Sequence, residues 1–386
     1  MSARRIAVLY GTRPEAIKVA PVVRALRSCS STDCLVISTG QHRGMLAHTG
    51  TSLDDVAAHD LDVFEPGQSP NMIMSKVLSR LDPLLKQLDP DVLLVQGDTS
   101  SAAAGGVSAF NCAIPLVHLE AGLRTGDMAS PFPEEGNRRL LGQLASLHLA
   151  TTVQAQNNLL AEGVAQKKIR VVGNTVVDAL SDALEQSASF SDPAVAEVCG
   201  AAPDLVTITT HRRENWGEGI IGIGGAVRML ASRLPDHVFV LPLHANPIVR
   251  APLTALLGEV KNVILTEPMG YVEFAHLMAR SKAVLTDSGG VQEEASSLGK
   301  PLFVLRESTE RPEVLTGGSG RLVGTEAERV VESVLSVLSD EVGYEEMVRS
   351  ANPYPPGRAA PRVVSAIAEV LGGLPDPTAH GGVPCW

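Results

Sequence analysis

Short apolar runs recur along the chain, and most of them are continuous rather than alternating with polar residues. A continuous apolar run is typical of a strand that is buried on both faces of a parallel sheet. In the first half the runs are RIAVLY (5–10), CLVIST (34–39), DVLLVQ (91–96), IPLVHL (114–119), SLHLATT (146–152) and KIRVVG (168–173). In the second half they are LVTITT (205–210), VFVLPLH (238–244), NVILT (262–266), AVLT (283–286) and PLFVLR (301–306).

Stretches with helical periodicity lie between these runs, at 16–26, 72–88, 102–110 and 291–298 among others. Strands that alternate with helices predict βαβ units, and here the series occurs twice. The chain has 386 residues, which is long for one core, and the Ala- and Ser-rich segment 180–204 separates the two series. We therefore predict two Rossmann-like domains, 1–180 and 181–360. We expect a helix at 361–374 that packs back on the N-terminal domain, and a loose tail at 375–386.

Composition narrows the class of protein. Apolar residues make up 44% and charged residues 19%, as in an ordinary soluble globular protein. We find neither a signal-peptide core nor an apolar run of the roughly 18 to 20 residues that a spanning helix needs, so we expect no membrane association. The net charge of −11 argues against a nucleic-acid surface. Five cysteines, widely spaced and odd in number, favour thiols in the reducing cytoplasm.

Loops that follow parallel strands carry the ligand sites of such folds. The stretch GTRPEAIK (11–18) follows the first strand and opens a helix. Gly11 permits a tight turn, and Pro14 fits the first helical turn. Arg13 and Lys18 add positive charge near a helix N-terminus, which predicts an anion site, although solvated charges at a plain helix start would look the same.

Two carboxylate-bearing stretches follow later strands of the first half. Asp98, after the strand at 91–96, is by itself most simply the N-cap of the next helix. The stretch HLEAGLRTGDMASPFPEEGNRRL (118–140) concentrates carboxylates and guanidiniums between two apolar runs. Its charged residues are Glu120, Arg124, Asp127, Glu134, Glu135, Arg138 and Arg139. Alone, this composition also permits a surface salt-bridge network.

The second half has two further clusters at strand ends. THRREN (210–215) places His211 beside two arginines, which favours anion binding or acid–base work, and His244 repeats this theme more weakly. The stretch LTDSGGVQEEASSLGKP (285–301) ends a strand at Asp287 and Ser288, and Gly289 and Gly290 lead directly into a helix. Such a start favours a phosphate, with Glu294 one turn later for ribose hydroxyls, but a Ser-capped glycine turn is about equally common.

Several familiar site patterns are missing from the sequence. The G-x-x-x-x-G-K-[ST] spacing, H-E-x-x-H and G-x-S-x-G do not occur. GIGGAV (222–227) lacks the last glycine of the dinucleotide fingerprint and has no strand directly before it. We therefore expect no metal and no nicotinamide cofactor.

Together these stretches resemble one family, the non-hydrolysing UDP-N-acetylglucosamine 2-epimerases. Nine motifs in the family's order carry the resemblance: GTRPEAIK, QHR, GDT, HLEAGLRTGD, SPFPEEGNRR, GNTVVDAL, THRREN, LTDSGGVQEEASSLGKP and TERPE. The resemblance implies a GT-B fold, with two Rossmann-like domains and the active site in the interdomain cleft. It also implies a cytoplasmic homodimer that interconverts UDP-GlcNAc and UDP-ManNAc for surface polysaccharide or glycoconjugate synthesis, without a cofactor.

The family's route eliminates UDP to give 2-acetamidoglucal and then adds it back. Matching positions imply a catalytic set of Asp98, Glu120, Glu134, Arg138 and His211, with Asp98 and Glu120 in C2 proton transfer. The matching UDP contacts are Arg13, Lys18, His211, Ser288, Gly289, Gly290 and Glu294. A second, activating UDP-GlcNAc site in bacterial members matches Gln41, His42, Arg212 and His244. Gly44 stands where a long polar residue is frequent, which argues against such activation here.

Other readings stay open at this level. A hydrolysing 2-epimerase would share the fold and the glycal route and differ in the access of water. A GT-B glycosyltransferase needs an acceptor pocket and often a membrane-facing basic or apolar patch, which the acidic chain lacks. A non-catalytic UDP-sugar sensor would not need Asp98, Glu120, Glu134 and His211. An epimerase acting on a modified UDP-sugar fits the same residues.

Overall fold

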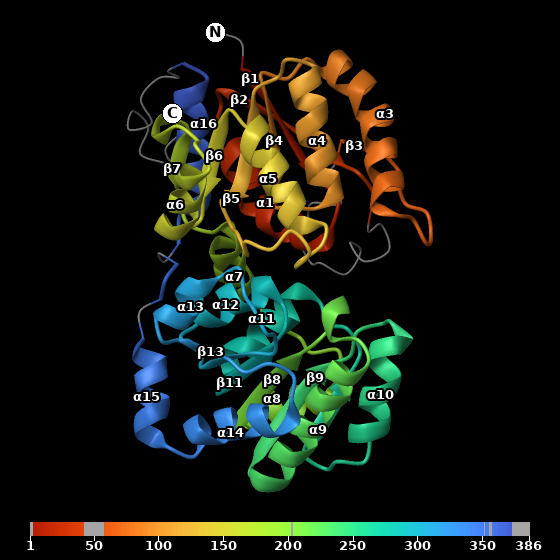
Figure 1. Cartoon of the computed structure of the whole chain (residues 1–386), viewed down its shortest axis with the longest axis vertical. Helices are drawn as coiled ribbons and strands as arrows, with labels where there is room; N and C mark the ends of the chain where they lie inside the picture. The colour runs from red at the N-terminus through yellow and green to blue at the C-terminus, as the bar shows by residue number, and fades with distance from the viewer. Residues whose placement is uncertain (1–2, 42–57, 202–203, 351, 355–356, 373–386) are drawn as a thin grey trace. The chain divides into compact units, whose positions relative to one another are not determined.

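The computed structural model describes residues 3–41, 58–201, 204–350, 352–354 and 357–372 (Figure 1). The chain forms two compact units, which we call unit 1 (Met1–Ala179 with Pro356–Trp386) and unit 2 (Leu180–Pro355). The boundary predicted after residue 180 lies beside this division. Each unit is a parallel sheet covered by helices, so the prediction of two Rossmann-like domains is confirmed. The tail predicted at 375–386 lies outside the described residues.

The described part of unit 1 contains a seven-stranded parallel sheet in the order β3-β2-β1-β4-β5-β6-β7. The strands are β1 (Arg4–Tyr10), β2 (Thr32–Ser38), β3 (His59–Asp60), β4 (Val92–Gln96), β5 (Leu116–Ala121), β6 (Leu147–Ala150) and β7 (Ile169–Val171). All six predicted apolar runs are strands, and β3 was not predicted because it has only two residues. The chain order reverses between β1 and β4, where loops from both sides of the reversal come together.

The helices of unit 1 begin at residues suited to a helix start. The side chains of Ser69, Thr99 and Thr152 each accept a backbone N–H bond at the first turn of the following helix. The helices are α1 (Arg13–Arg27), α3 (Pro70–Leu88), α4 (Ser100–Asn111), α5 (Glu134–Leu144), α6 (Val153–Ala161), the short 3₁₀ turn η1 (Gln166–Lys168), the first part of α7 (Thr175–Glu185), and α16 (Ala359–Val370).

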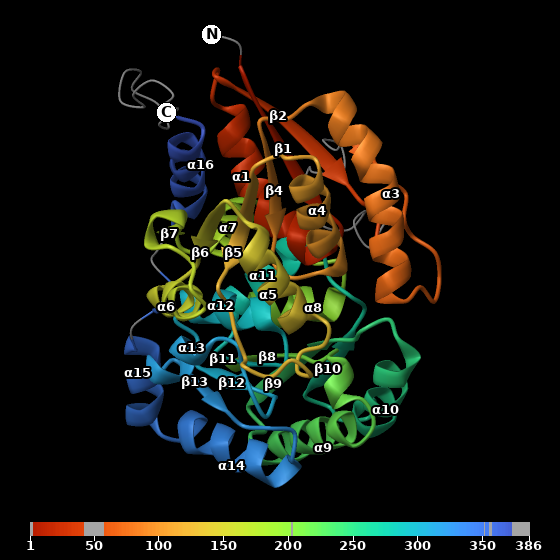
Figure 2. The same ribbon diagram turned by 45° about the horizontal axis from the view of Figure 1, so that its top comes forward.

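The last described helix, α16, packs on unit 1 although it follows unit 2 in the sequence. It lies beside β6 and contacts α1 (Figure 2). The Ala360 N–H donates to the Asp178 carboxylate at 2.7 Å, and Arg170 pairs with Glu369 at 2.6 Å. Val363, with Ala360, belongs to the same apolar cluster as the strands of unit 1.

The described part of unit 2 contains a six-stranded parallel sheet in the order β10-β9-β8-β11-β12-β13. The strands are β8 (Asp204–Thr209), β9 (His237–Pro242), β10 (Val263–Thr266), β11 (Ala283–Thr286), β12 (Leu302–Val304) and β13 (Gly320–Leu322). The helical segments are the end of α7, α8 (Pro193–Ala201), η2 (Arg213–Asn215), α9 (Glu218–Arg233), α10 (Pro247–Leu257), α11 (Tyr271–Arg280), α12 (Gly289–Ser297), α13 (Pro312–Thr316), α14 (Ala327–Leu338) and α15 (Glu341–Arg349). The five predicted strands are confirmed.

Burial explains why the strands lack alternation. In β1, Ile6, Val8 and Tyr10 belong to one apolar cluster, and Ala7 and Leu9 belong to another. Successive side chains of a strand point to opposite faces, so both faces of this sheet are covered. Within the described residues, no helix combines the length and the apolar character needed to cross a membrane.

Two buried histidines face each other across β5 and β6. His118 pairs in register with His148, and each is about 1% exposed. Burial lowers the pKa of His118 to about 4 and that of His148 to about 3. Both imidazoles are therefore neutral in the folded chain at pH values where an unfolded chain binds protons.

We expect the free energy of unfolding to fall as the pH is lowered from 6.5 toward 4, because only the unfolded state takes up these two protons. Each histidine contributes a slope of up to about 1.4 kcal/mol per pH unit in this window. Urea unfolding between pH 5 and 6.5 should show a shallower slope in His148→Gln than in the wild type. Equal slopes in wild type and His148→Gln would contradict the assignment.

Candidate active site

The turn between β1 and α1 is closed by a buried carboxylate of the same motif. Glu15 accepts hydrogen bonds from the Gly11 N–H at 3.0 Å, the Thr12 N–H at 2.7 Å and the Thr99 hydroxyl at 2.7 Å. A Cβ on Gly11 would lie 2.5 Å from the hydroxyl oxygens of Ser101 and Thr39, so only glycine fits there. Desolvation by burial raises the pKa of Glu15 to about 6.

The chain itself thus supplies an anion at this helix start. We predicted an external anion here on the strength of the helix N-terminus and two cations. Since the N–H groups of Gly11 and Thr12 are bonded to Glu15, an external anion would depend on side chains such as Arg13. Sequence reasoning missed Glu15, although a Glu three residues after Thr12 is the spacing of a capping box.

Lys18 and Glu120 form a buried ion pair. The Lys18 Nζ lies 2.5 Å from the Glu120 Oε1, and the two side chains are only 9% and 6% exposed. The Gln96 amide, at the end of β4, donates to the other carboxylate oxygen of Glu120. Lys18, which the resemblance assigned to the diphosphate, is therefore engaged with a carboxylate in this structure.

The backbone at Glu120 has an uncommon conformation. Its φ is 63°, in the left-handed region that non-glycine residues seldom adopt, and the β5–β6 register shifts between Leu119 and Ala121. A shift of this kind redirects a side chain at the end of a strand. It coincides with a buried ion pair, and strained backbone of this kind clusters at functional sites.

Asp98 lies beside this pair and has its own cation. Arg138, from α5, places Nε and Nη2 each 2.7 Å from the Asp98 Oδ2. The Asp98 side chain is 24% exposed, so it is more open than Glu120. The reading of Asp98 as an N-cap is wrong, because the Thr99 side chain caps α4.

The turn at Gly97 lies next to both Glu120 and Asp98. A Cβ on Gly97 would lie 3.7 Å from the Glu120 Oε2, and Asp98 is the next residue. The His118 ring nitrogen Nε2 lies 2.7 Å from the Gly97 carbonyl oxygen, and because the buried ring is neutral, Nε2–H donates to it. The structure therefore brings Lys18, Glu120, Asp98 and Arg138 together at the carboxyl edge of the unit 1 sheet.

Of the other charged residues in the stretch 118–140, some hold the loop in place and others remain candidates for the site. Glu135 is fully buried and accepts from the Thr125 N–H at 3.1 Å and from Arg138 at 3.3 Å. Arg124 pairs with Glu162 at 2.7 Å. Glu134 is the first residue of α5 and is partly exposed. Two X-Pro bonds here, Ser130–Pro131 and Phe132–Pro133, are cis. Part of the stretch thus forms ion pairs, but they involve buried side chains and not the surface salt-bridge network that the composition also permitted.

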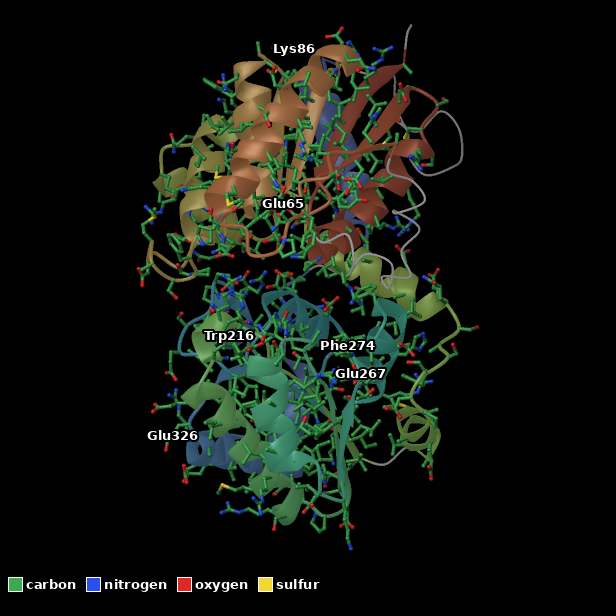
Figure 3. The ribbon with its side chains drawn as sticks, turned by 90° about the vertical axis from the view of Figure 1, so that its right-hand side faces the viewer. Glu65, Lys86, Trp216, Glu267, Phe274 and Glu326 are labelled. Carbon is green, nitrogen blue, oxygen red and sulfur yellow. The ribbon has the colours of Figure 1, made fainter. Side chains whose placement is uncertain are left out.

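In unit 2 the buried carboxylate of Asp287 organises the loop after β8. It accepts from the backbone N–H groups of His211 at 2.9 Å and Arg212 at 3.0 Å, and from the Asn215 amide at 3.0 Å. The His211 Nδ1 lies 3.4 Å from the Asp287 Oδ1, and the ring is 43% exposed. Trp216, labelled in Figure 3, donates its indole N–H to the His211 carbonyl at 3.2 Å.

At the helix start after Ser288, a steric reason for glycine exists at Gly289 but not at Gly290. A Cβ on Gly289 would lie 2.5 Å from the Arg311 Nη1, whereas a Cβ on Gly290 would meet nothing within 4 Å. Ser288 occupies the N-cap position, but its side chain makes no capping hydrogen bond, so the alternative of a Ser-capped turn is wrong. Arg311 itself pairs with Glu293 at 2.7 Å and Glu310 at 2.5 Å.

The residues assigned to an activating site belong to both units. Gln41, in unit 1, accepts from the Ser101 hydroxyl at 2.7 Å. In unit 2, the His244 and His211 rings stack with centroids 6.0 Å apart, and Arg212 lies 3.5 Å from Glu310. His42 and Gly44 lie outside the described residues.

A cation site is not evident in the part of the chain that the structure describes. There, no group of three or more His, Cys, Asp and Glu side chains is arranged to hold a metal ion. The four cysteines in that part, Cys29, Cys34, Cys112 and Cys199, are free thiols.

Known proteins match this chain over most of its length. The family model described as UDP-N-acetylglucosamine 2-epimerase matches residues 24–368. The chain is 44% identical over 369 residues to UDP-N-acetylglucosamine 2-epimerase of Escherichia coli K12, which covers 94% of this chain and 98% of the relative. The matches therefore extend over nearly the whole length of both chains.

Solved structures agree with the sequence comparison. The crystal structure of UDP-GlcNAc 2-epimerase from Neisseria meningitidis bound to UDP-GlcNAc has a TM-score of 0.88 and 42% identity, and covers 95% of this chain and all of that one. The Methanocaldococcus jannaschii enzyme in complex with UDP-GlcNAc and UDP has a TM-score of 0.80 and 31% identity, and covers 95% and 99% of the two chains. The predicted fold class, two Rossmann-like domains of GT-B type, is confirmed.

The Glu15 contacts generate a stability test. Glu15→Ala leaves two backbone N–H groups without their acceptor and should lower the free energy of unfolding by about 2 to 4 kcal/mol. Glu15→Gln keeps an oxygen for both N–H groups and offers an amide to Thr99. Because burial raises the pKa of Glu15 to about 6, the neutral amide also avoids the cost of a buried charge at pH 8. Urea unfolding at pH 8 should find Glu15→Gln at least as stable as the wild type; equal losses in both variants would refute this.

Proposed function

The chain belongs to the UDP-N-acetylglucosamine 2-epimerase family, and we propose that it catalyses the reversible epimerisation of UDP-GlcNAc to UDP-ManNAc at C2. The observation that carries the proposal is that Glu120 and Asp98 both lie at the Gly97 turn. Glu120 is paired with Lys18 at 2.5 Å, and Asp98 with Arg138 at 2.7 Å. Two carboxyl groups at one strand edge suit an inversion at carbon, because one can accept the proton that leaves C2 and the other, as the acid, can deliver a proton to the opposite face.

We propose a non-hydrolysing enzyme, as the family resemblance implies, and the elimination route, because the C2 hydrogen of the sugar is not acidic. Cleavage of the C1–O bond sends its electron pair to the departing UDP. Loss of the C2 proton to a carboxylate then leaves the C1–C2 double bond of 2-acetamidoglucal. In the second half UDP adds back at C1, while a proton arrives at the opposite face of C2. Glu120 and Asp98 are our candidates for the two proton positions.

The leaving diphosphate needs positive charge and N–H donors. We assign this role to Arg13, to His211, and to the helix start at Ser288, Gly289 and Gly290. His211 is supported by its exposure beside a fully buried Asp287, which holds the loop through backbone N–H groups. Lys18 is assigned to hold the Glu120 carboxylate in place rather than to contact phosphate, since its Nζ is 2.5 Å from that carboxylate. Glu294 is assigned to the ribose.

Other features of the family extend the proposal. Arg138 orients Asp98, and Glu134, at the start of α5 one turn from Arg138, is assigned to the sugar. The Gln41, His42, Arg212 and His244 set as an activating site, the homodimer, the cytoplasmic location and the supply of ManNAc-type sugars for surface polymers stay predictions.

The reaction itself is tested by NMR of the purified protein with UDP-GlcNAc in D2O, without added cofactor. We expect a mixture with UDP-ManNAc and solvent deuterium at C2 of both sugars, because the glycal route exchanges that proton. Absence of deuterium at C2 would exclude proton transfer. Free ManNAc as the only product would indicate a hydrolysing enzyme instead.

The role of Glu120 is tested by Glu120→Gln. The amide preserves the shape of the side chain and cannot accept the C2 proton, so turnover should fall by at least about two orders of magnitude while the fold is kept. Glu162→Gln is the matched control, since it removes a carboxylate that pairs with Arg124 at 2.7 Å in the same unit. Circular dichroism checks folding of both variants. Turnover near the wild-type value in Glu120→Gln would remove Glu120 from the mechanism.

A further inference from the structure

Tyr271 is a buried tyrosine that meets a carboxylate at the carboxyl edge of the unit 2 sheet. It is the first residue of α11, directly after the loop that follows β10, and Phe274 of the same helix is labelled in Figure 3. Its hydroxyl donates to the Glu294 Oε1 at 2.7 Å. Both residues are about 5% exposed. Neither the strand pattern nor the motifs pointed to Tyr271.

The bond has a defined direction. Burial, and then the neighbouring Glu294 charge, raises the pKa of Tyr271 well above its ordinary value. The hydroxyl therefore stays protonated and acts as the donor, with the carboxylate as acceptor. An ionised carboxylate has about four acceptor positions on two oxygens, so one hydroxyl fixes its orientation and leaves further positions for other donors.

The neighbouring glutamate shows a different arrangement. Glu293 is fully buried and forms an ion pair with Arg311 at 2.7 Å, which ties α12 to the segment before α13. Glu294 accepts the hydroxyl of Tyr271 at 2.7 Å. A hydrogen bond of this kind orients the carboxylate, which suits a carboxylate that receives hydroxyl donors from a ligand.

The position of Glu294 on α12 suits the binding of a nucleotide. Glu294 lies one turn after Gly290, about 6 Å along the helix axis from the start assigned to the diphosphate. In a nucleoside diphosphate the ribose is bonded directly to the α-phosphate. One helix can thus address the phosphates with its N-terminal N–H groups and the ribose with a side chain one turn later.

We propose that Tyr271 is a positioning residue that orients the Glu294 carboxylate toward the vicinal diol of the ribose, and so makes the site selective for ribonucleotides over deoxyribonucleotides. This inference rests on the proposed function, which assigns Glu294 to the ribose. A purely structural contact between α11 and α12 would instead affect all ligands alike.

The test is calorimetric binding of UDP and of 2′-deoxy-UDP to wild type and to Tyr271→Phe. Removal of the hydroxyl should weaken UDP binding about tenfold, the usual scale for one hydrogen bond to a charged group. We expect 2′-deoxy-UDP to bind the wild type more weakly than UDP, and its binding should change by less than about twofold in Tyr271→Phe. In turnover assays KM for UDP-GlcNAc should rise while kcat stays near the wild-type value.

Tyr344→Phe is the matched control. It removes a partly buried tyrosine hydroxyl of the same unit, which donates to the Lys282 carbonyl at 3.1 Å. It should leave both affinities unchanged. A double variant with Glu294→Gln should bind UDP no more weakly than Glu294→Gln alone, because the hydroxyl acts only through the carboxylate.

The contradicting outcomes are distinct. If Tyr271→Phe weakens the binding of UDP and of 2′-deoxy-UDP equally, the Tyr271–Glu294 contact is only structural. If UDP binding is unchanged, Tyr271 has no role in nucleotide binding. Either result overturns the inference and leaves the epimerase proposal intact. A wild-type protein that binds no UDP would overturn the proposed function, and this inference with it.

Discussion

Buried carboxylates that accept backbone N–H groups hold the loops on which the candidate site depends. Glu15 accepts from Gly11 and Thr12 in unit 1, and Asp287 accepts from His211 and Arg212 in unit 2. A parallel strand that ends in a tight turn exposes N–H groups for which no further strand provides acceptors. A fully buried carboxylate supplies them only where its bonds offset the cost of desolvation. In both units a buried carboxylate accepts these N–H groups.

This constraint separates the carboxylates into two classes. Glu15, Glu135 and Asp287 are buried and receive backbone donors, so they hold loops in place. Glu120 and Asp98 have cations as partners, and Asp98 retains contact with solvent. Charged residues lie close together in the sequence because scaffold and candidate chemistry share the same loops. Glu135 also accepts from Arg138 at 3.3 Å, so the scaffold carboxylates are recognised by their backbone N–H donors rather than by the absence of a cation.

Much of the fold was readable from the pattern of residues, because both faces of each sheet are buried. That burial requires continuous apolar runs, and all eleven runs identified are strands. The strands β3 and β13 were missed, since two or three residues carry no periodicity. Thr99 was also missed as the cap of α4, because Asp98 beside it is an equally good capping residue and only the backbone path selects between them.

The sequence by itself determined the two parallel-sheet domains, the strand ends at which polar residues gather, and the family. These follow from local composition and from ordered motifs, which need no knowledge of distant contacts. Tertiary structure decided which groups meet: Lys18 with Glu120 across 102 positions, Arg138 with Asp98, and Tyr271 with Glu294. Such pairings depend on how strands are ordered in the sheet. Two residues far apart in the chain become neighbours only when parallel strands bring their carboxyl ends to one edge.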